Sequence, residues 1–295
     1  MNRILLAFTF VALASCGSKN SNSLDTKTSA HIINGQEVKE NALITTSIVG
    51  LYDVKANYIC TGSLIAPNVV MTAAHCMPER ASDMRVVFGN DIDDMMNARE
   101  VDVLQEHVLR VTDFKVSTKW NPSDENRQVD TGDIALIKFK GAIPEGYKIA
   151  TFLPNQNLIK KGTMVTVAGY GVNVIDGEVI DPRKYKNLDQ AIEDGEVFCD
   201  DDKRNCMKVE SSGDGLLRQT QAPISSVQDT EVRLDERKAG TCSGDSGGPA
   251  YIEQNGQYYL FGVTSRGSLL CNETGVYTNA LEYMQWINDT IKILK

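Results

Sequence analysis

The chain has 295 residues, of which 42% are hydrophobic and 23% are charged, and its formal net charge is −9. The length allows one large domain or two small ones with a sizeable core, and the composition is that of a globular protein. The negative charge, without any block of basic residues, argues against nucleic acid and against an anionic membrane surface as partners.

The first residues are typical of an export signal. Arg3 supplies a positive start, and residues 4–14 form an apolar run of 11 residues, which is too short for a bilayer span of about 20 residues. No later segment is long and apolar enough for a membrane helix. We therefore predict a signal peptide over 1–15 and export to an oxidising compartment, where disulfides persist.

The chain contains seven cysteines, an odd number for an exported protein, which normally pairs them. The sequence Leu13-Ala14-Ser15-Cys16 offers two explanations. Cleavage after Ala14 would leave a secreted protein with a spare thiol. The same four residues also resemble the bacterial lipobox, in which the signal is cut before a cysteine that is then acylated. We favour a lipid on Cys16, because it leaves six cysteines to pair.

A change of composition at Ile32 separates a linker from a folded domain. Residues 17–31 are polar, rich in Ser, Asn and Thr, and contain one leucine, so we predict a flexible linker or propeptide over 16–31. From Ile32 onward, short strand-like runs alternate with turn residues, a density typical of a sandwich or barrel. Strands are predicted at 63–65, 69–72, 84–88, 134–139, 164–168, 216–221, 258–263 and 276–278.

Two segments depart from this strand pattern. Residues 173–215 have few apolar clusters and hold 12 Asp and Glu against 6 Lys and Arg, which indicates a functional or mobile loop. Cys199 and Cys206 lie within this segment, only seven positions apart, and we expect a disulfide between them that cross-links the segment internally. In residues 280–295, apolar side chains recur at spacings of 3, 4 and 3, which predicts a helix packed on the barrel surface.

The strongest functional signal is the run Gly244-Asp245-Ser246-Gly247-Gly248-Pro249. A serine framed by glycines indicates a bent backbone with N–H groups pointing into a cavity and the hydroxyl exposed, because glycine permits the necessary φ values. A plain glycine-rich turn between strands is the alternative. A serine hydroxyl needs a base within hydrogen-bond reach to act as a nucleophile, and histidine is the usual base at neutral pH.

Only three histidines are available as that base. His31 lies in the predicted linker, and His107 lies among apolar residues, which indicates a half-exposed strand position. His75 remains, among small residues and a cysteine. The base in turn needs a carboxylate, and Asp133 precedes the apolar run 134–139, where an unpaired buried charge would be expensive. A solvated turn aspartate is the alternative interpretation of Asp133.

These motifs, in the order His, Asp, Ser, resemble those of the trypsin/chymotrypsin family of serine proteases. The resemblance rests on Ile32-Ile33-Asn34-Gly35 as a mature N-terminus and on the segments 60–65 with 73–76, 133–137 and 244–249. It covers about residues 32–290 apart from 173–215. It implies an all-β fold of two six-stranded antiparallel β-barrels packed together, with the active site between them and a C-terminal α-helix. A protease domain over 32–295 would follow the linker.

The resemblance also implies roles for individual residues. His75, Asp133 and Ser246 would form the catalytic triad, and Ser265 would support the aspartate. The backbone N–H groups of Gly244 and Ser246 would form the oxyanion hole. The implied disulfides are Cys60–Cys76 and Cys242–Cys271, which leaves Cys199–Cys206 as a pair of this chain's own and Cys16 as the leftover cysteine.

The primary substrate pocket would be lined by Gly240 at its floor, by Gly267 and Gly275 as walls, and by Ser265. Trypsin-like members carry an aspartate at the position of Gly240. Three glycines predict a roomy, uncharged pocket and cleavage after large apolar residues such as Phe, Tyr, Leu or Met. Arg266 stands where the family usually has a tryptophan.

No cofactor and no metal are expected. Asp91, Asp93 and Asp94 fall in a loop where some family members bind calcium, but a solvated acidic loop is the preferred interpretation. The expected partners are protein or peptide substrates, and the expected state is a monomer. The alternative class is a catalytically inactive homologue that acts as a binding or adhesion module.

Cleavage between His31 and Ile32 is expected to activate a zymogen. In the family, the freed α-amino group pairs with the aspartate before the nucleophile, here Asp245, in a buried ion pair. The family mostly has Arg or Lys before the cut, so His31 makes a trypsin-like activator unexpected. If Cys16 is lipidated, the same cut would release the enzyme. We therefore expect a bacterial envelope lipoprotein, or a secreted extracellular or periplasmic enzyme after processing.

Overall fold

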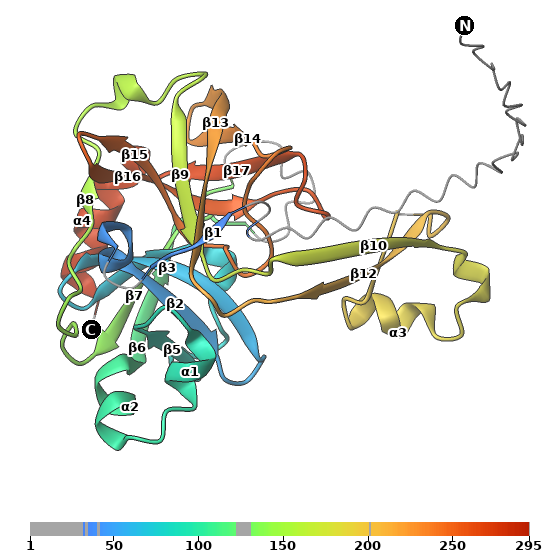
Figure 1. The fold of residues 1–295 in the computed structure, drawn as a ribbon, viewed down its shortest axis with the longest axis horizontal. Coiled ribbons are helices and arrows are strands. Elements are labelled where there is room, and N and C mark those ends of the chain that lie inside the picture. Colours follow the sequence, from blue (N-terminus) through green and yellow to red (C-terminus); the bar gives the residue numbers. More distant parts are fainter. Residues whose placement is uncertain (1–31, 33–34, 40–41, 122–130, 201, 295) are drawn as a thin grey trace, which may run out of the picture.

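The computed structural model describes residues 32, 35–39, 42–121, 131–200 and 202–294, and these include two β-barrels that pack against each other (Figure 1). The predicted signal peptide, the predicted linker and Cys16 lie outside the described residues. Within the described part of the chain, no helix combines the length and the apolar character that a membrane span requires.

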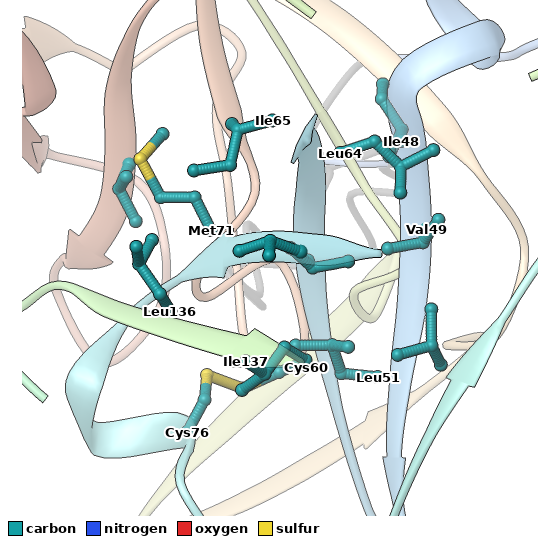
Figure 2. Close-up of a cluster of buried hydrophobic side chains, with 14 of the residues drawn as sticks. Ile48, Val49, Leu51, Cys60, Leu64, Ile65, Met71, Cys76, Leu136 and Ile137 are labelled. Carbon is teal, nitrogen blue, oxygen red and sulfur yellow. A yellow bond between two sulfur atoms is a disulfide. The ribbon is translucent and has the colours of Figure 1, made fainter. Parts of the chain in front are cut away.

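The first barrel is closed, and its strands pair antiparallel in the order β2-β3-β4-β7-β6-β5. They are β2 (Ile48–Asp53), β3 (Tyr58–Ala66), β4 (Val69–Thr72), β5 (Met84–Val87), β6 (Val108–Val116) and β7 (Ala135–Lys140). Leu51, Leu64 and Ile137 have no exposed surface and belong to the cluster drawn in Figure 2. Each such side chain contributes about 1.5–3 kcal/mol by leaving water, which favours the closed barrel.

The second barrel closes because β9 pairs with both β13 and β15. Its strands are β9 (Met164–Gly169), β13 (Arg218–Gln228), β14 (Glu231–Asp235), β15 (Pro249–Gln254), β16 (Gln257–Arg266) and β17 (Thr274–Asn279). Two short strands extend it, β1 (Gln36–Glu37) beside β13 and β8 (Thr151–Phe152) beside β16. The prediction of two six-stranded antiparallel barrels is confirmed.

The predicted elements correspond closely to the observed ones. All eight predicted strands coincide with or overlap observed strands. The C-terminal helix is also confirmed, as the 3₁₀ turn η6 (Ala280–Tyr283) followed by α4 (Met284–Ile293). Ile287 is buried in the core cluster of the first barrel, and Lys138 of β7 donates a hydrogen bond of 3.1 Å to the Leu294 carbonyl. The helix therefore packs against the first barrel.

Two short helices follow β5, and they correct one prediction. They are α1 (Ile92–Met96) and α2 (Val101–His107). The expectation of a strand position for His107 is wrong, because His107 ends α2, where its Nδ1 lies 2.9 Å from the Phe88 carbonyl oxygen. Asp91 caps α1, since its side chain accepts a hydrogen bond from the Asp94 backbone N–H.

Residues 173–215 are not an irregular loop, contrary to the prediction. β10 (Val174–Ile180) pairs along its length with β12 (Cys206–Ser212), and β11 (Val197–Cys199) adds a third antiparallel strand. α3 (Leu188–Glu193) packs against this sheet. We call residues 174–212 the arm, since it projects from the barrels in Figure 1. The remaining 3₁₀ turns of the described chain are η1 (Leu43–Ser47), η2 (Ala74–Cys76), η3 (Ala81–Asp83), η4 (Gln156–Leu158) and η5 (Pro182–Lys184).

Candidate active site

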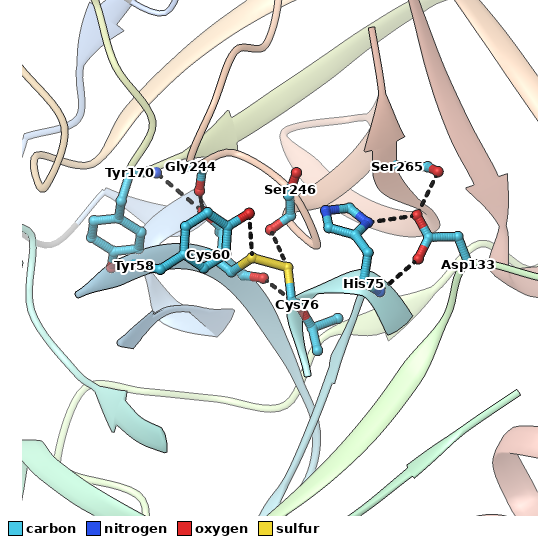
Figure 3. Close-up of a disulfide and its surroundings, with 11 residues drawn as sticks. Tyr58, Cys60, His75, Cys76, Asp133, Tyr170, Gly244, Ser246 and Ser265 are labelled. Carbon is cyan, nitrogen blue, oxygen red and sulfur yellow. Dashed lines mark hydrogen bonds and ion pairs between the residues drawn. A yellow bond between two sulfur atoms is a disulfide. The ribbon is translucent and has the colours of Figure 1, made fainter. Parts of the chain in front are cut away.

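The structure brings His75, Asp133 and Ser265 together where the two barrels meet. His75 lies in η2 after β4, Asp133 lies just before β7, and Ser265 lies near the end of β16. The Asp133 carboxylate accepts hydrogen bonds from the His75 backbone N–H (3.1 Å) and from the Ser265 hydroxyl (2.6 Å). Its Oδ2 lies 2.8 Å from His75 Nδ1 (Figure 3). Three contacts thus fix the aspartate and orient the imidazole ring.

Asp133 is almost completely buried, with 1% of its surface exposed. Burial, the largest single effect, raises its pKa. The hydrogen bonds from His75 and Ser265, together with the charge of His75, outweigh burial and leave the pKa of Asp133 below its ordinary value. The carboxylate is therefore ionised at neutral pH, as a partner of an imidazolium must be.

Ser246 lies on the opposite side of the His75 ring from Asp133 in Figure 3. Its loop needs glycine, since Gly244 and Gly247 have φ values of +95° and +82°. A side chain at Gly247 would also overlap the Thr72 hydroxyl. The Ser246 carbonyl accepts a hydrogen bond of 2.8 Å from the Thr61 backbone N–H, which ties the serine loop to β3.

Two residues near the serine loop were missed by the sequence interpretation. The Thr61 hydroxyl donates a hydrogen bond of 3.0 Å to the Gly244 carbonyl and accepts one of 3.1 Å from the Tyr170 N–H, so it fixes the orientation of the peptide after Gly244. Burial raises the pKa of the Tyr58 hydroxyl. A hydrogen bond with the Ser246 side chain lowers the same pKa by a smaller amount. Thr61 lies in the segment 60–65 that resembles the family, but the sequence interpretation assigned no role to its side chain, and Tyr58 lies in no motif.

Asp245 is fully buried beneath the serine loop. Its carboxylate accepts backbone hydrogen bonds from Gly171 (2.8 Å) and Cys242 (2.9 Å). Burial nevertheless raises its pKa to about 7, since these donors are neutral and compensate only part of the lost hydration. Ile32 is also fully buried.

Three disulfides cross-link the described chain, Cys60–Cys76, Cys199–Cys206 and Cys242–Cys271. Cys60–Cys76 joins β3 to the residue after His75, and Cys242–Cys271 joins the serine loop to the segment before β17. Cys199–Cys206 lies inside the arm. In the described residues, the one cluster with metal-ligand spacing is Cys60, His75 and Cys76, and its two sulfurs are joined to each other, so no thiolate is available there for a metal.

The carboxyl group of Glu236 lies between Gly240 and Gly275, two of the three glycines of the predicted substrate pocket. The prediction of an uncharged pocket did not take this acid into account. A side chain added at Gly240 would overlap the Glu236 side chain, and one added at Gly275 would overlap its carboxyl oxygens. At Gly267 the nearest atom would be the Thr274 carbonyl oxygen, at 3.7 Å.

Glu236 is 2% exposed and is held by neutral groups. It accepts hydrogen bonds from the Thr241 N–H and hydroxyl, both at 3.2 Å, and from the Tyr277 hydroxyl. Burial raises its pKa to about 7 despite these donors. Sequence reasoning missed Glu236, because Asp235-Glu236-Arg237-Lys238 has the composition of a solvated charged turn.

Arg266, at the position where the family usually has a tryptophan, forms a largely buried ion pair with Glu231. The two nitrogens of the Arg266 guanidinium donate to the two oxygens of Glu231, each at 2.9 Å. Glu231 is 3% exposed, and Oε1 also accepts from the Thr131 N–H (3.4 Å). The arginine side chain is therefore committed to an internal ion pair.

A family model described as Trypsin matches residues 32–287, most of the chain. The chain belongs to the trypsin family. It is therefore a serine endopeptidase, and its three disulfides fit an extracellular or secreted protein. Chymotrypsin-like elastase family member 1 of Canis lupus familiaris is 29% identical over 90% of this chain and 94% of its own length.

Other relatives agree with this trypsin-family membership. The CLIP domain-containing serine protease B4 of Anopheles gambiae is 26% identical over 96% of this chain and 78% of its own length. A solved structure of neuropsin, a serine protease expressed in the limbic system of mouse brain, superposes with a TM-score of 0.61 and 20% identity. The superposition covers 87% of this chain and 98% of the neuropsin chain, and it supports the trypsin-like fold.

Proposed function

We propose that this trypsin-family protein is an exported endopeptidase in which Ser246 is the nucleophile, His75 the general base and Asp133 the orienting carboxylate. The Ser246 hydroxyl attacks the scissile carbonyl carbon while His75 Nε2 takes its proton, and His75 then gives that proton to the leaving amine. Water hydrolyses the acyl-enzyme by the same steps in reverse. The hydrogen bond of 2.8 Å between His75 Nδ1 and the buried, ionised Asp133 carries this proposal.

The backbone N–H groups of Gly244 and Ser246 would stabilise the oxyanion that develops on the substrate. Two contacts support this assignment, the hydrogen bond from Thr61 to the Gly244 carbonyl and the one from the Thr61 N–H to the Ser246 carbonyl. They hold the peptide group that follows each of these residues, and so restrain the loop backbone next to both N–H donors before substrate binds.

Cleavage before Ile32 would activate the enzyme. The family model begins at Ile32, and the buried Asp245 is held only by neutral backbone donors in the contacts that the structure gives it. A new α-amino group on Ile32 would supply the missing positive charge and lower the pKa of Asp245.

The predicted lipid on Cys16 would anchor the precursor to the envelope, and the activating cut would release the active domain. Its support is the LASC sequence and the odd cysteine count, since the six cysteines of the described chain are paired. We do not extend the proposal to cleavage after large apolar residues, because an apolar side chain that reached Gly240 and Gly275 would meet the buried Glu236 carboxyl.

A fluorophosphonate probe, which reacts with activated serines, tests this function. Purified protein should be labelled, Ser246→Ala should abolish labelling, and the matched control Ser243→Ala, an exposed serine in the same loop, should keep it. A folded protein with a free Ile32 N-terminus that stays unlabelled would instead favour the binding or adhesion module.

A further inference from the structure

Glu236 lies at the junction of the two segments that flank the serine loop. It follows β14 directly, and its backbone N–H donates a hydrogen bond of 2.8 Å to the Glu273 carbonyl, just before β17. This pairing directs the side chain between Gly240 and Gly275, where any larger residue would overlap it. Because neither glycine has a side chain, the space between them accommodates the carboxyl group of Glu236.

The carboxyl group is linked to the serine loop through Thr241. Thr241, which holds it with two hydrogen bonds, is five residues before Ser246 and next to the Cys242–Cys271 disulfide. The negative charge of Glu236 also contributes to the raised pKa of Asp245. Glu236 thus lies under the same loop that carries the nucleophile.

The surroundings of Glu236 leave its negative charge incompletely balanced. The donors that reach it, from Thr241 and Tyr277, are neutral, and the facing charged group on the serine loop is the acid Asp245. Arg218 acts on Asp245, and its guanidinium donates to the carbonyl oxygens of Gly213, Leu216 and Gly171. An ionised carboxyl in such a site would gain from an added cation, whereas an apolar group beside it would leave the charge buried and unpaired.

We propose that Glu236 determines specificity by binding the side chain of a lysine or arginine that precedes the scissile bond of the substrate. This inference rests on the proposed function. The carboxylate comes from the end of β14 instead of from the position of Gly240, so the pocket is acidic although its floor residue is glycine. A guanidinium or ammonium group entering between Gly240 and Gly275 would meet the Glu236 oxygens directly.

This specificity should depend on pH, because only the ionised carboxyl attracts a cation. Burial raises the pKa of Glu236 to about 7, so the preference for a basic residue should be strong at about pH 8.5 and weaker by about tenfold at about pH 6. The ratio of kcat/KM for two matched substrates isolates this effect, since the ionisation of His75 affects both substrates equally and cancels.

The experiment compares peptides that differ only in arginine or its neutral isostere citrulline before the scissile bond, with phenylalanine and leucine peptides beside them. The fluorophosphonate-reactive enzyme should cleave the arginine peptide at least about 100-fold faster than the citrulline peptide at about pH 8.5. Glu236→Gln should remove most of that ratio. Glu273→Gln, which removes an exposed charge nearby, should leave the ratio unchanged.

A ratio near one in wild type, a preference for phenylalanine or leucine, or an unchanged ratio in Glu236→Gln would overturn the proposal. If Glu236→Gln does not fold, the wild-type ratio and its pH dependence decide. If the wild type is not labelled by fluorophosphonate, the proposed function fails, and calorimetry with benzamidine, a small aromatic cation, against neutral benzamide then tests the pocket by itself. Equal binding of the two compounds would overturn the acidic pocket.

Discussion

The proposed triad and the proposed substrate pocket each contain one buried carboxyl group, and the two groups behave in opposite ways. Asp133 and Glu236 are 1% and 2% exposed, yet the pKa of Asp133 lies below its ordinary value and that of Glu236 is raised to about 7. The difference is the partner: a histidine ring for Asp133, and neutral hydroxyl and amide groups for Glu236. Burial sets the cost of a charge, and the partner decides whether the charge is kept.

The largest effect is expected from Asp133→Asn. An asparagine can keep the geometry but stabilises the wrong tautomer of His75 and no imidazolium, so kcat should fall by about 10⁴-fold. Steady-state kinetics with a peptide substrate at about pH 8 measures this. Glu236→Gln is the matched comparison, since it also converts a buried acid to its amide but should retain turnover of uncharged substrates. A loss of less than about tenfold in Asp133→Asn would remove Asp133 from the mechanism.

The second largest effect is expected on the free energy of unfolding, which Glu236→Gln should increase. The folded protein binds a proton at Glu236 more tightly than the unfolded chain, because the folded pKa of about 7 exceeds the ordinary value of 4.5. Stability is therefore lost as the pH rises from about 4.5 through about 7, and a neutral glutamine avoids this loss.

Urea denaturation at about pH 8, in a Ser246→Ala background that prevents autolysis, should show the free energy of unfolding rise by about 1–3 kcal/mol in Glu236→Gln. At about pH 5 the gain should disappear, since wild-type Glu236 is protonated there. Asp133→Asn should do the reverse and destabilise at about pH 8, because the lowered pKa of Asp133 contributes stability above its ordinary value and loses it as the pH falls. An equal change of stability at both pH values in Glu236→Gln would contradict this explanation.

The smallest effect is expected from Thr241→Val, which removes one neutral donor from Glu236 at nearly constant volume. The hydroxyl stabilises the charged form, so its loss should raise the pKa of Glu236 further, by about one unit or less. The midpoint of the pH dependence of the arginine to citrulline ratio should move up by that amount. A downward shift would show that Thr241 does not donate to the carboxylate.

Much of this protein could be predicted from its residues in order along the chain. Strand-length apolar runs gave the positions of eight strands, and the 3, 4, 3 spacing gave the C-terminal helix, because both signals depend on a repeat within a few residues. The glycines around Ser246 indicated its loop for the same local reason. With three histidines to choose from, the environment of His75 was enough to select it.

The arm and the short helix at His107 were missed, because neither follows from local pattern alone. The sequence of 173–215 is too polar to suggest strands. β10 and β12 are stabilised by pairing with each other, and the Cys199–Cys206 disulfide links β12 to β11. His107 lies among apolar residues that suit a strand, but its ring contacts the Phe88 carbonyl from the end of α2.

Tertiary structure alone decided the chemistry of the proposed pocket. The sequence contains three glycines that suit an open pocket and, elsewhere, a glutamate in a charged turn. The pairing of β14 with β17 brings that glutamate between Gly240 and Gly275, which lie 4 and 39 positions further along the chain. Likewise, Arg266 and Glu231 are 35 residues apart and meet only when β16 and β14 flank β17. Local sequence determines turns and periodicity, whereas a buried charge is defined by neighbours that only the closed barrel brings together.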